Sequence, residues 1–243
     1  MWTPSVGLSN AQVLDPMVTQ KSPGIYKFKL TAEGLTSTNL VTNGDFENGN
    51  SGFSSEYNFG IPGSPFGPDW YGVGSNPHDY NTGFTTCGDN TSGGGNMLIV
   101  DGSTTPGKRF WCQTVPVTVG KTYQLEFYSM SVFPVAPGVV TVTVNGTNVG
   151  TTTVSGMCDW VKFEACFVAT SGSAQICLSE VSGIGYGNDF AIDDIALYEK
   201  CIDEDEVIVE IVDLKAVLNI PKRPKCSSEV FDLAGIGSST GPK

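Results

Sequence analysis

The chain has 243 residues, and 25 acidic against 13 basic side chains give it a formal net charge of −12. A chain this acidic repels phosphate and anionic lipid headgroups, which argues against nucleic acid or a lipid surface as a partner. No apolar run approaches the roughly 20 residues that a membrane-spanning helix needs. A single histidine leaves little room for histidine-based triads or zinc catalysis.

Short alternating strands separated by glycine and asparagine turns run along the chain, and no segment shows the apolar spacing of a helix. The first clear strand covers 24–31, and a strand-rich block follows from 39 to 199. Strands within this block are expected at 97–100, 123–129, 139–144, 150–154, 161–167, 175–178 and 190–198. This spacing predicts an all-β fold built as an antiparallel sandwich.

The C-terminal region, 200–243, opens with the acidic run Asp203-Glu-Asp-Glu and continues as a long apolar strand from Val207 to Leu218. A basic, proline-rich turn at 221–225, a short strand from Glu229 to Leu233 and a Gly/Ser tail follow. No signal peptide accompanies this extracellular type of composition, which suggests a fragment of a longer protein.

The seven cysteines include no Cys-x-x-Cys pair, so zinc ribbons and thioredoxin-like motifs are not expected. Their spacing suits disulfides in an oxidising compartment, with buried thiols as the alternative. The expected bridges are Cys166–Cys177 on consecutive strands, Cys87–Cys112 around one strand and Cys201–Cys226 around another. Cys158 is then the odd thiol.

The middle block resembles a known family through five segments in order. They are Asn39-Leu-Val-Thr-Asn-Gly-Asp-Phe-Glu, Asn96-Met-Leu-Ile-Val-Asp-Gly, Trp111-Cys-Gln-Thr-Val, Trp160-Val-Lys-Phe-Glu and Asn188-Asp-Phe-Ala-Ile-Asp-Asp-Ile. Together they resemble the galactose-binding-like jelly rolls, specifically the carbohydrate-binding modules attached to secreted glycanases. The resemblance covers residues 39–199 and implies two antiparallel sheets, with the strand 40–46 beside the strand 190–197.

A structural calcium is common in that family. The resemblance implies that Glu47 and Asp193 hold it, with a backbone carbonyl of Asp45 or Met97 as a further oxygen ligand. Some members supply another Glu just before the Asn-x-Leu strand, where this chain has Gly94-Gly95, and this removes a charged ligand. The alternative is that the two carboxylates cap strand ends or bind backbone amides.

Glycan-binding members of the family stack sugars on exposed aromatic rings. The long loop 51–90 holds Trp70, Tyr71 and Tyr80, which are candidate ligand-binding residues, with packing against the sandwich as the alternative. A glycosidase needs two carboxylates at a defined separation, and no motif singles out such a pair. We therefore expect no enzyme.

The two ends of the chain resemble complementary halves of one PKD-like, immunoglobulin-type repeat of secreted bacterial surface proteins. Trp2-Thr-Pro, a Gly-Leu-Ser turn and the strand from Gly24 match its second half, and 200–243 matches its first half. The expected domains are thus 1–34, 39–199 and 200–243, with extra jelly-roll strands or frayed linkers as the alternative for both ends. The residues expected to join the halves are Trp2, Tyr26, Phe28, Leu30, Val207, Val209, Ile211, Val230 and Leu233.

Such halves can close within one chain, between chains, or along a longer tandem repeat. We favour closure between copies, which joins units head-to-tail into a filament. The sequence therefore predicts a non-catalytic structural or adhesive subunit at the cell surface, whose partners are copies of itself. The alternative is a carbohydrate-binding module whose partner is a glycan.

Overall fold

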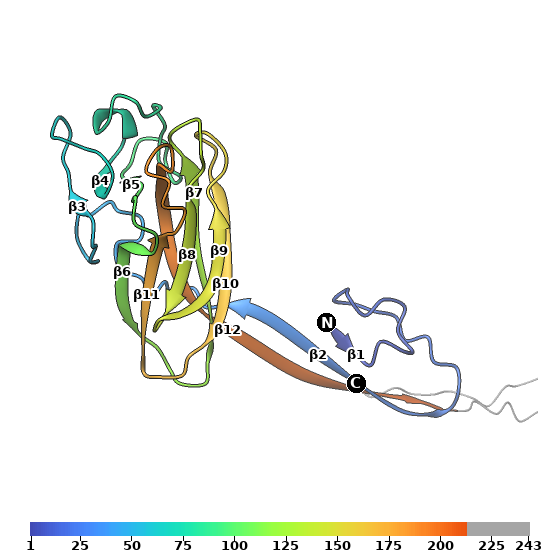
Figure 1. The fold of residues 1–243 in the computed structure, drawn as a ribbon. Helices are drawn as coiled ribbons and strands as arrows, with labels where there is room; N and C mark the ends of the chain where they lie inside the picture. Colours follow the sequence, from blue (N-terminus) through green and yellow to red (C-terminus); the bar gives the residue numbers. More distant parts are fainter. Residues whose placement is uncertain (213–243) are drawn as a thin grey trace, which may run out of the picture. The chain divides into compact units, whose positions relative to one another are not determined.

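The computed structural model describes residues 1–212, and the chain divides into two compact units. Unit 1 consists of Met1–Ala32 together with the segment that begins at Ile202, and unit 2 consists of Glu33–Cys201. Two strands, β2 (Gly24–Leu35) and β12 (Phe190–Ile211), have residues in both units (Figure 1).

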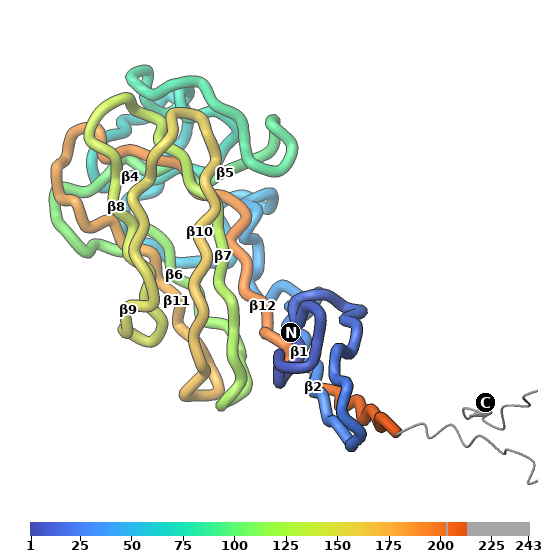
Figure 2. The backbone as a smooth tube through the Cα atoms, turned by 90° about the vertical axis from the view of Figure 1, so that its right-hand side faces the viewer, coloured from blue at the N-terminus to red at the C-terminus, as the bar shows by residue number. Residues whose placement is uncertain are grey.

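Unit 2 is a β-sandwich of two sheets, which confirms the predicted fold class. One sheet has the order β6–β11–β8–β9. In the other, β12 lies between β5 and β7, with β10 beyond β7 and with β4 and β3 beyond β5. Figure 2 shows β10, β7 and β12 side by side. The strands are β3 (Asn58–Phe59), β4 (Trp70–Gly74), β5 (Met97–Asp101), β6 (Lys108–Pro116), β7 (Thr122–Ser131), β8 (Val139–Val144), β9 (Thr147–Thr153), β10 (Val161–Val168) and β11 (Ser173–Glu180).

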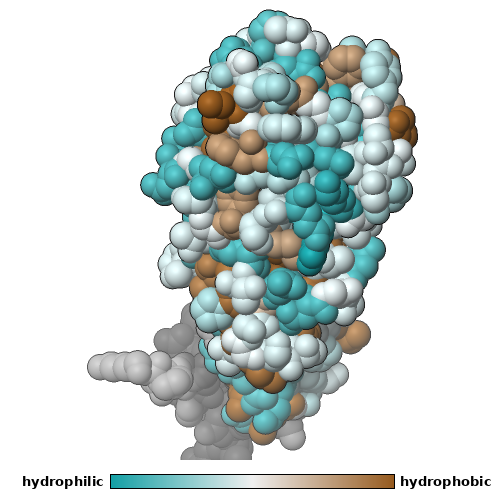
Figure 3. All heavy atoms as spheres, turned by 60° about the vertical axis from the view of Figure 1, so that its left-hand side comes forward, coloured by the Kyte–Doolittle hydropathy of each residue, from teal (hydrophilic) through white to brown (hydrophobic). Residues whose placement is uncertain are grey.

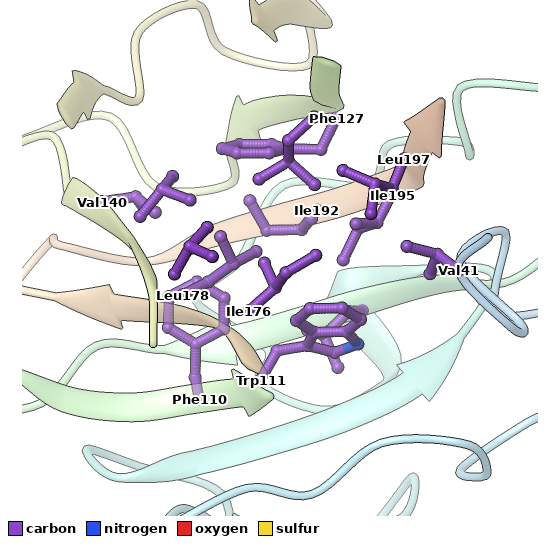
Figure 4. Packing of buried hydrophobic residues seen from close by; sticks show 14 of the residues in the cluster. Val41, Phe110, Trp111, Phe127, Val140, Ile176, Leu178, Ile192, Ile195 and Leu197 are labelled. Atoms are coloured by element: carbon purple, nitrogen blue, oxygen red, sulfur yellow. The ribbon is translucent and has the colours of Figure 1, made fainter. Parts of the chain in front are cut away.

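The core of unit 2 lies between its sheets and is filled by alternate side chains of each strand. On β7, Leu125 and Phe127 are fully buried, whereas Glu126 between them is only half-buried. Figure 4 shows Ile176 of one sheet and Ile192 of the other meeting in this core. Because each large apolar side chain contributes ~1.5–3 kcal/mol when buried, this core is the main source of stability. On the face shown in Figure 3, hydrophobic residues are scattered among hydrophilic ones.

The first segment of the sandwich lies beside its last strand, as the resemblance implies. Leu40 N donates to Leu197 O at 2.9 Å, and Ile195 N donates to Gly44 O at 2.9 Å. The approach is so close that a Cβ at position 44 would collide with the carbonyl oxygen of Ile195, so only glycine fits there. The described helical content is one 3-10 turn, Pro77–Asp79, and none of the described helices is long and apolar enough to cross a membrane.

Two disulfides are present in the described residues, and they differ from the expected pairs. Cys112 is joined to Cys177, and Cys87 is joined to Cys158. The expected bridges Cys166–Cys177 and Cys87–Cys112 are therefore wrong, and Cys158 is not the odd thiol.

The pairing of the strands explains this error, because the prediction assumed that consecutive strands are neighbours. In the sandwich β10 pairs with β7, which puts Cys166 opposite Gln124. β11 pairs instead with β6, which puts Cys177 directly opposite Cys112. The remaining cysteines are two exposed free thiols, Cys166 and Cys201, and one residue outside the described range, Cys226. The expected Cys201–Cys226 bridge thus stays a prediction.

In unit 1 the two ends of the chain meet. β1 (Trp2–Thr3) pairs with β2, and β2 also pairs with β12. Across the second pair, Lys27 Nζ lies 3.1 Å from Glu206 Oε1, and Lys29 Nζ lies 2.6 Å from Glu204 Oε2. Among the buried hydrophobic residues of the described range, Phe28 alone belongs to unit 1.

The residues expected to join two halves are thus found together within one chain, as far as they are described. Those lining one groove of unit 1 are Trp2, Phe28, Val207 and Val209, and those that are half-buried are Tyr26, Leu30 and Ile211. Val230 and Leu233 lie outside the described residues. The immunoglobulin-like architecture and the closure between copies stay predictions.

Candidate functional site

The candidate site is a groove of about 400 Å³ in unit 2, which we call the β12 groove. Its floor comes from β12 at Asp194–Tyr198, and the segment 39–45, hydrogen-bonded to β12, forms one side. The strand β7 forms the other side through Glu126 and Tyr128. All of these residues belong to a single unit, so the groove is a property of the sandwich itself.

The alternation of the strands turns two tyrosines toward this groove. Leu125 and Phe127 of β7 point into the core, so Glu126 and Tyr128 face outward, and the same alternation on β12 turns Tyr198 outward. Both tyrosines are half-buried. Within the described part of the chain, neither hydroxyl has a hydrogen-bond partner, so both remain able to bind a ligand.

The other polar groups of the β12 groove are mostly acidic. Glu126 is paired with Lys162, whose Nζ lies 2.9 Å from Glu126 Oε2. Asp194 is held by Thr91 Oγ1 at 2.9 Å and by Asn90 Nδ2 at 2.8 Å, both neutral donors. The groove therefore offers oriented carboxylates that accept hydrogen bonds, and its charge disfavours anionic ligands.

The loop 89–96, which contributes Asn90 to the groove, gathers three carboxylates through its backbone. The contacts are Asn90 N to Asp193 Oδ2 at 2.9 Å, Gly95 N to Asp89 Oδ1 at 2.9 Å and Asn96 N to Glu47 Oε1 at 2.7 Å. Glu47 and Asp193, the ligands that the resemblance implies for calcium, thus meet one loop. Both also bind backbone amides, which was the alternative for them.

Burial and the neighbouring charge of Asp194 raise the pKa of Asp193 to about 7. Burial acts in the same direction on Asp89, but hydrogen bonds from Ser92 and Gly95 outweigh it and lower the pKa of Asp89. Asp193, the buried neighbour of the groove residue Asp194, is therefore a carboxyl group that a nearby cation would ionise.

The surroundings of Gly95 are a further observation, beside the raised pKa of Asp193, that bears on cation binding. A Cβ at this position would collide with Glu47 Oε1 and would lie 2.9 Å from Asp89 Oδ2, so two carboxylates converge where a side chain is absent. Asp89 thus lies where the sequence lacks the further Glu of some family members. The sequence prediction missed Asp89, and its only signal is an Asp-Asn-Thr-Ser turn before the Gly-rich run. Converging like charges suit Ca²⁺, a hard cation that prefers oxygen ligands.

In the described residues, no three His, Cys, Asp or Glu side chains come together as a metal-binding group, so backbone or amide oxygens would have to complete the coordination of a cation at Gly95. Asp45 does not join the other carboxylates: it is exposed, accepts a 3.4 Å hydrogen bond from Glu47 N and lines the β12 groove.

The three aromatic residues expected to bind sugar lie outside this groove. Tyr71 and Tyr80 are each 7% exposed, and Tyr80 Oη donates to Val73 O at 2.7 Å. Trp70 is half-buried, with its ring centroid 6.5 Å from that of Phe66. Two of the three rings are therefore too buried to stack on a ligand, and Trp70 packs beside Phe66.

Comparison with known proteins finds solved structures of low similarity to this chain. No protein-family model and no curated protein sequence matches it. A family 16 carbohydrate-binding module is 19% identical, with a TM-score of 0.41, over 65% of this chain and 99% of that one. A family 61 module in complex with β-1,4-galactotriose is 19% identical, with a TM-score of 0.43, over 67% and 99%.

A Stig cyclase from Fischerella sp. TAU is 16% identical, with a TM-score of 0.48, over 69% of this chain and 98% of that one. The solved structures thus include both binding modules and a cyclase. These identities and TM-scores are too low to assign a family, a ligand or a residue role to this chain.

Proposed function

We propose that this chain is a non-catalytic extracellular glycan-binding module and that its ligand occupies the β12 groove. The observation that carries the proposal is the pair of half-buried tyrosines, Tyr128 and Tyr198, beside the carboxylates of Asp45 and Asp194. A sugar ring presents C–H groups that pack on an aromatic face and hydroxyls that donate to carboxylates. The groove offers both kinds of contact within about 400 Å³.

The two disulfides support an extracellular location, because such bridges persist in oxidising compartments. They tie β6 to β11 and the loop around Cys87 to the segment around Cys158. These covalent cross-links would stabilise the module outside the cell.

Calcium is part of the proposal as a structural ion. Glu47 and Asp89 would hold it at Gly95, with Asp193 close by, and the ion would supply the positive charge that these carboxylates lack. These residues fix the loop 89–96, and that loop positions Asn90 against Asp194 in the groove. The ion would therefore support the groove without contacting a ligand.

Titration calorimetry against a panel of soluble neutral glycans tests the proposal. Tyr128→Ala and Tyr198→Ala should each weaken the binding of a glycan by about tenfold, equivalent to about 1.4 kcal/mol. Tyr186→Ala is the matched control, because Tyr186 is a 68% exposed tyrosine outside the groove. Loss of binding in Tyr186→Ala alone, or no binding of any glycan, would contradict the proposal.

A second candidate is a structural subunit that assembles head-to-tail. The observation that favours it is the set of apolar side chains that unit 1 leaves exposed, among them Val6, Leu14 and Met17 at 75%, 80% and 72%. Sedimentation velocity over a hundredfold range of concentration separates this candidate from a monomeric module. A single species of monomer mass throughout would exclude it.

A further inference from the structure

The β12 groove carries negative charge that the side chains around it do not fully neutralise. Three carboxylates line the groove, those of Asp45, Glu126 and Asp194, and none of its described lining residues is basic. Within the part of the chain that the structure describes, only Glu126 of the three has an ion-pair partner, which is Lys162. The groove therefore keeps two carboxylates, those of Asp45 and Asp194, without a cation beside them.

Two neutral amide side chains of the groove are already engaged with the backbone. Asn39 Oδ1 accepts from Leu197 N at 3.0 Å, and Asn43 Nδ2 donates to Gly49 O at 2.9 Å. These bonds hold the segment 39–45 in place and leave fewer amide groups for a ligand. The polar groups that a ligand can reach are therefore mainly carboxylates, which only accept hydrogen bonds, and tyrosine hydroxyls.

The carboxylate of Asp194 is held in one orientation and still keeps its charge. Thr91 Oγ1 and Asn90 Nδ2 donate to it at 2.9 and 2.8 Å, and both donors are neutral. The half-buried rings of Tyr128 and Tyr198 line the same groove. Aromatic rings attract cations that lie over their faces, and carboxylates bind them through charge-assisted hydrogen bonds. An organic cation would therefore find both kinds of contact in this groove.

We infer, on the basis of the proposed function, that the β12 groove prefers glycans with protonated amino groups, such as chains of glucosamine, over their N-acetylated forms. A protonated amine donates up to three hydrogen bonds and supplies the positive charge that Asp45 and Asp194 lack. An N-acetyl group removes that charge, and an anionic sugar would be repelled. The formal net charge of −12 acts in the same direction over a longer range.

The expected preference is modest, because water reaches the two carboxylates. Asp45 is exposed and Asp194 is half-buried, and ion pairs in such positions are individually weak. Together they should make a tetramer of β-1,4-linked glucosamine bind about tenfold more tightly than its N-acetylated counterpart. Added salt should reduce this ratio, because dissolved ions screen exposed charges.

Titration calorimetry of the full-length chain with both tetramers, at one pH below the pKa of the amine, tests the inference. Asp45→Asn and Asp194→Asn should each reduce the affinity ratio about threefold. Lys162→Gln should raise the ratio, because it leaves Glu126 unpaired beside the ligand. Asp159→Asn is the matched control, since Asp159 is an exposed carboxylate that does not line the groove, and it should leave the ratio unchanged. Near-UV circular dichroism shows that each variant remains folded.

The outcomes separate this inference from the proposed function. Equal affinity for the two tetramers, with Tyr128→Ala weakening both, would overturn the inference and leave the groove as a site for neutral glycans. Absence of binding by the glucosamine tetramer would overturn the inference, whichever neutral glycan the groove binds. An equal reduction of the ratio in Asp159→Asn and Asp45→Asn would assign the preference to the net charge of the chain instead of the groove. A lysine tetrapeptide that binds as tightly as the glucosamine tetramer would show that the groove recognises amines without recognising a sugar, which also contradicts the inference.

Discussion

Replacing Cys112 and Cys177 together by alanine should destabilise unit 2 strongly. The two residues lie directly opposite each other on β6 and β11, with their Cα atoms 4.2 Å apart, and they are separated by 65 residues in sequence. A bridge that closes a loop of this length restricts the unfolded chain by about 4 kcal/mol in the chain-entropy account. That is a large share of the roughly 5–15 kcal/mol by which a domain is stable.

The exposed thiol of Cys166 provides the matched control. It lies on β10, opposite Gln124, and it has no disulfide partner in the described residues. Cys166→Ala should therefore change the free energy of unfolding by no more than about 0.5 kcal/mol, as surface substitutions usually do. The contrast between the two variants separates the loss of a bridge from the loss of a thiol.

Two measurements decide the outcome. Urea unfolding followed by tryptophan fluorescence gives the free energies, and peptide mapping without reduction identifies the bridged cysteines. The reasoning fails if mapping finds Cys166 bonded to Cys177, or if the double variant loses less than about 1 kcal/mol while the Cys112–Cys177 bridge is present in the wild-type chain.

Three further changes have expected outcomes. Burial and the charge of Asp189 raise the pKa of Asp101 to about 7. Between pH 4 and pH 7 the folded chain therefore keeps a proton that the unfolded chain has lost, and stability decreases as the pH rises. The urea midpoint of the wild-type chain should fall from pH 4 to pH 7, and it should fall less in Asp101→Asn. Excess Ca²⁺ should raise the melting temperature relative to EDTA, with stabilisation of about 2.7 kcal/mol at a hundredfold excess over Kd, and Glu47→Gln should abolish the difference. Gly44→Ala should cost more than about 2 kcal/mol in urea unfolding, because its Cβ meets the carbonyl of Ile195.

The alternation in the sequence was sufficient to predict local structure. Leu125 and Phe127 alternate with Glu126 and Tyr128, and the structure buries the first two and turns the second two outward. A single strand, however, carries no information about its neighbour. Tyr128 became a candidate site residue only when β12 brought Tyr198 to the same groove, and this pairing joins positions about 70 residues apart.

The residues proposed to hold calcium show the same limit of sequence-based prediction. Glu47 and Asp193 came from the resemblance, because their segments have recognisable patterns at the two ends of the sandwich. Asp89 lies in an irregular loop, where side-chain direction follows no period, so its convergence with Glu47 at Gly95 required coordinates. The disulfides failed for a related reason, since the spacing of cysteines along a chain does not say which sheet each strand joins.

The path of the chain through unit 2 bears on whether unit 1 closes within one chain or between two. Thr36 N donates to Glu199 O, and Leu40 N donates to Leu197 O, each at 2.9 Å, so the chain enters and leaves the sandwich on neighbouring segments. Folding of unit 2 therefore brings the segments 24–32 and 202–211 close together, so their pairing costs little additional loop-closure entropy. Closure between copies would first have to separate that pair and expose Phe28, which is 2% exposed. The exposed ion pairs of Lys27 and Lys29 contribute little energy against this separation. The hydrogen bonds between the strands and the burial of Phe28 therefore favour the monomer. Exchange of segments between copies then requires a high protein concentration.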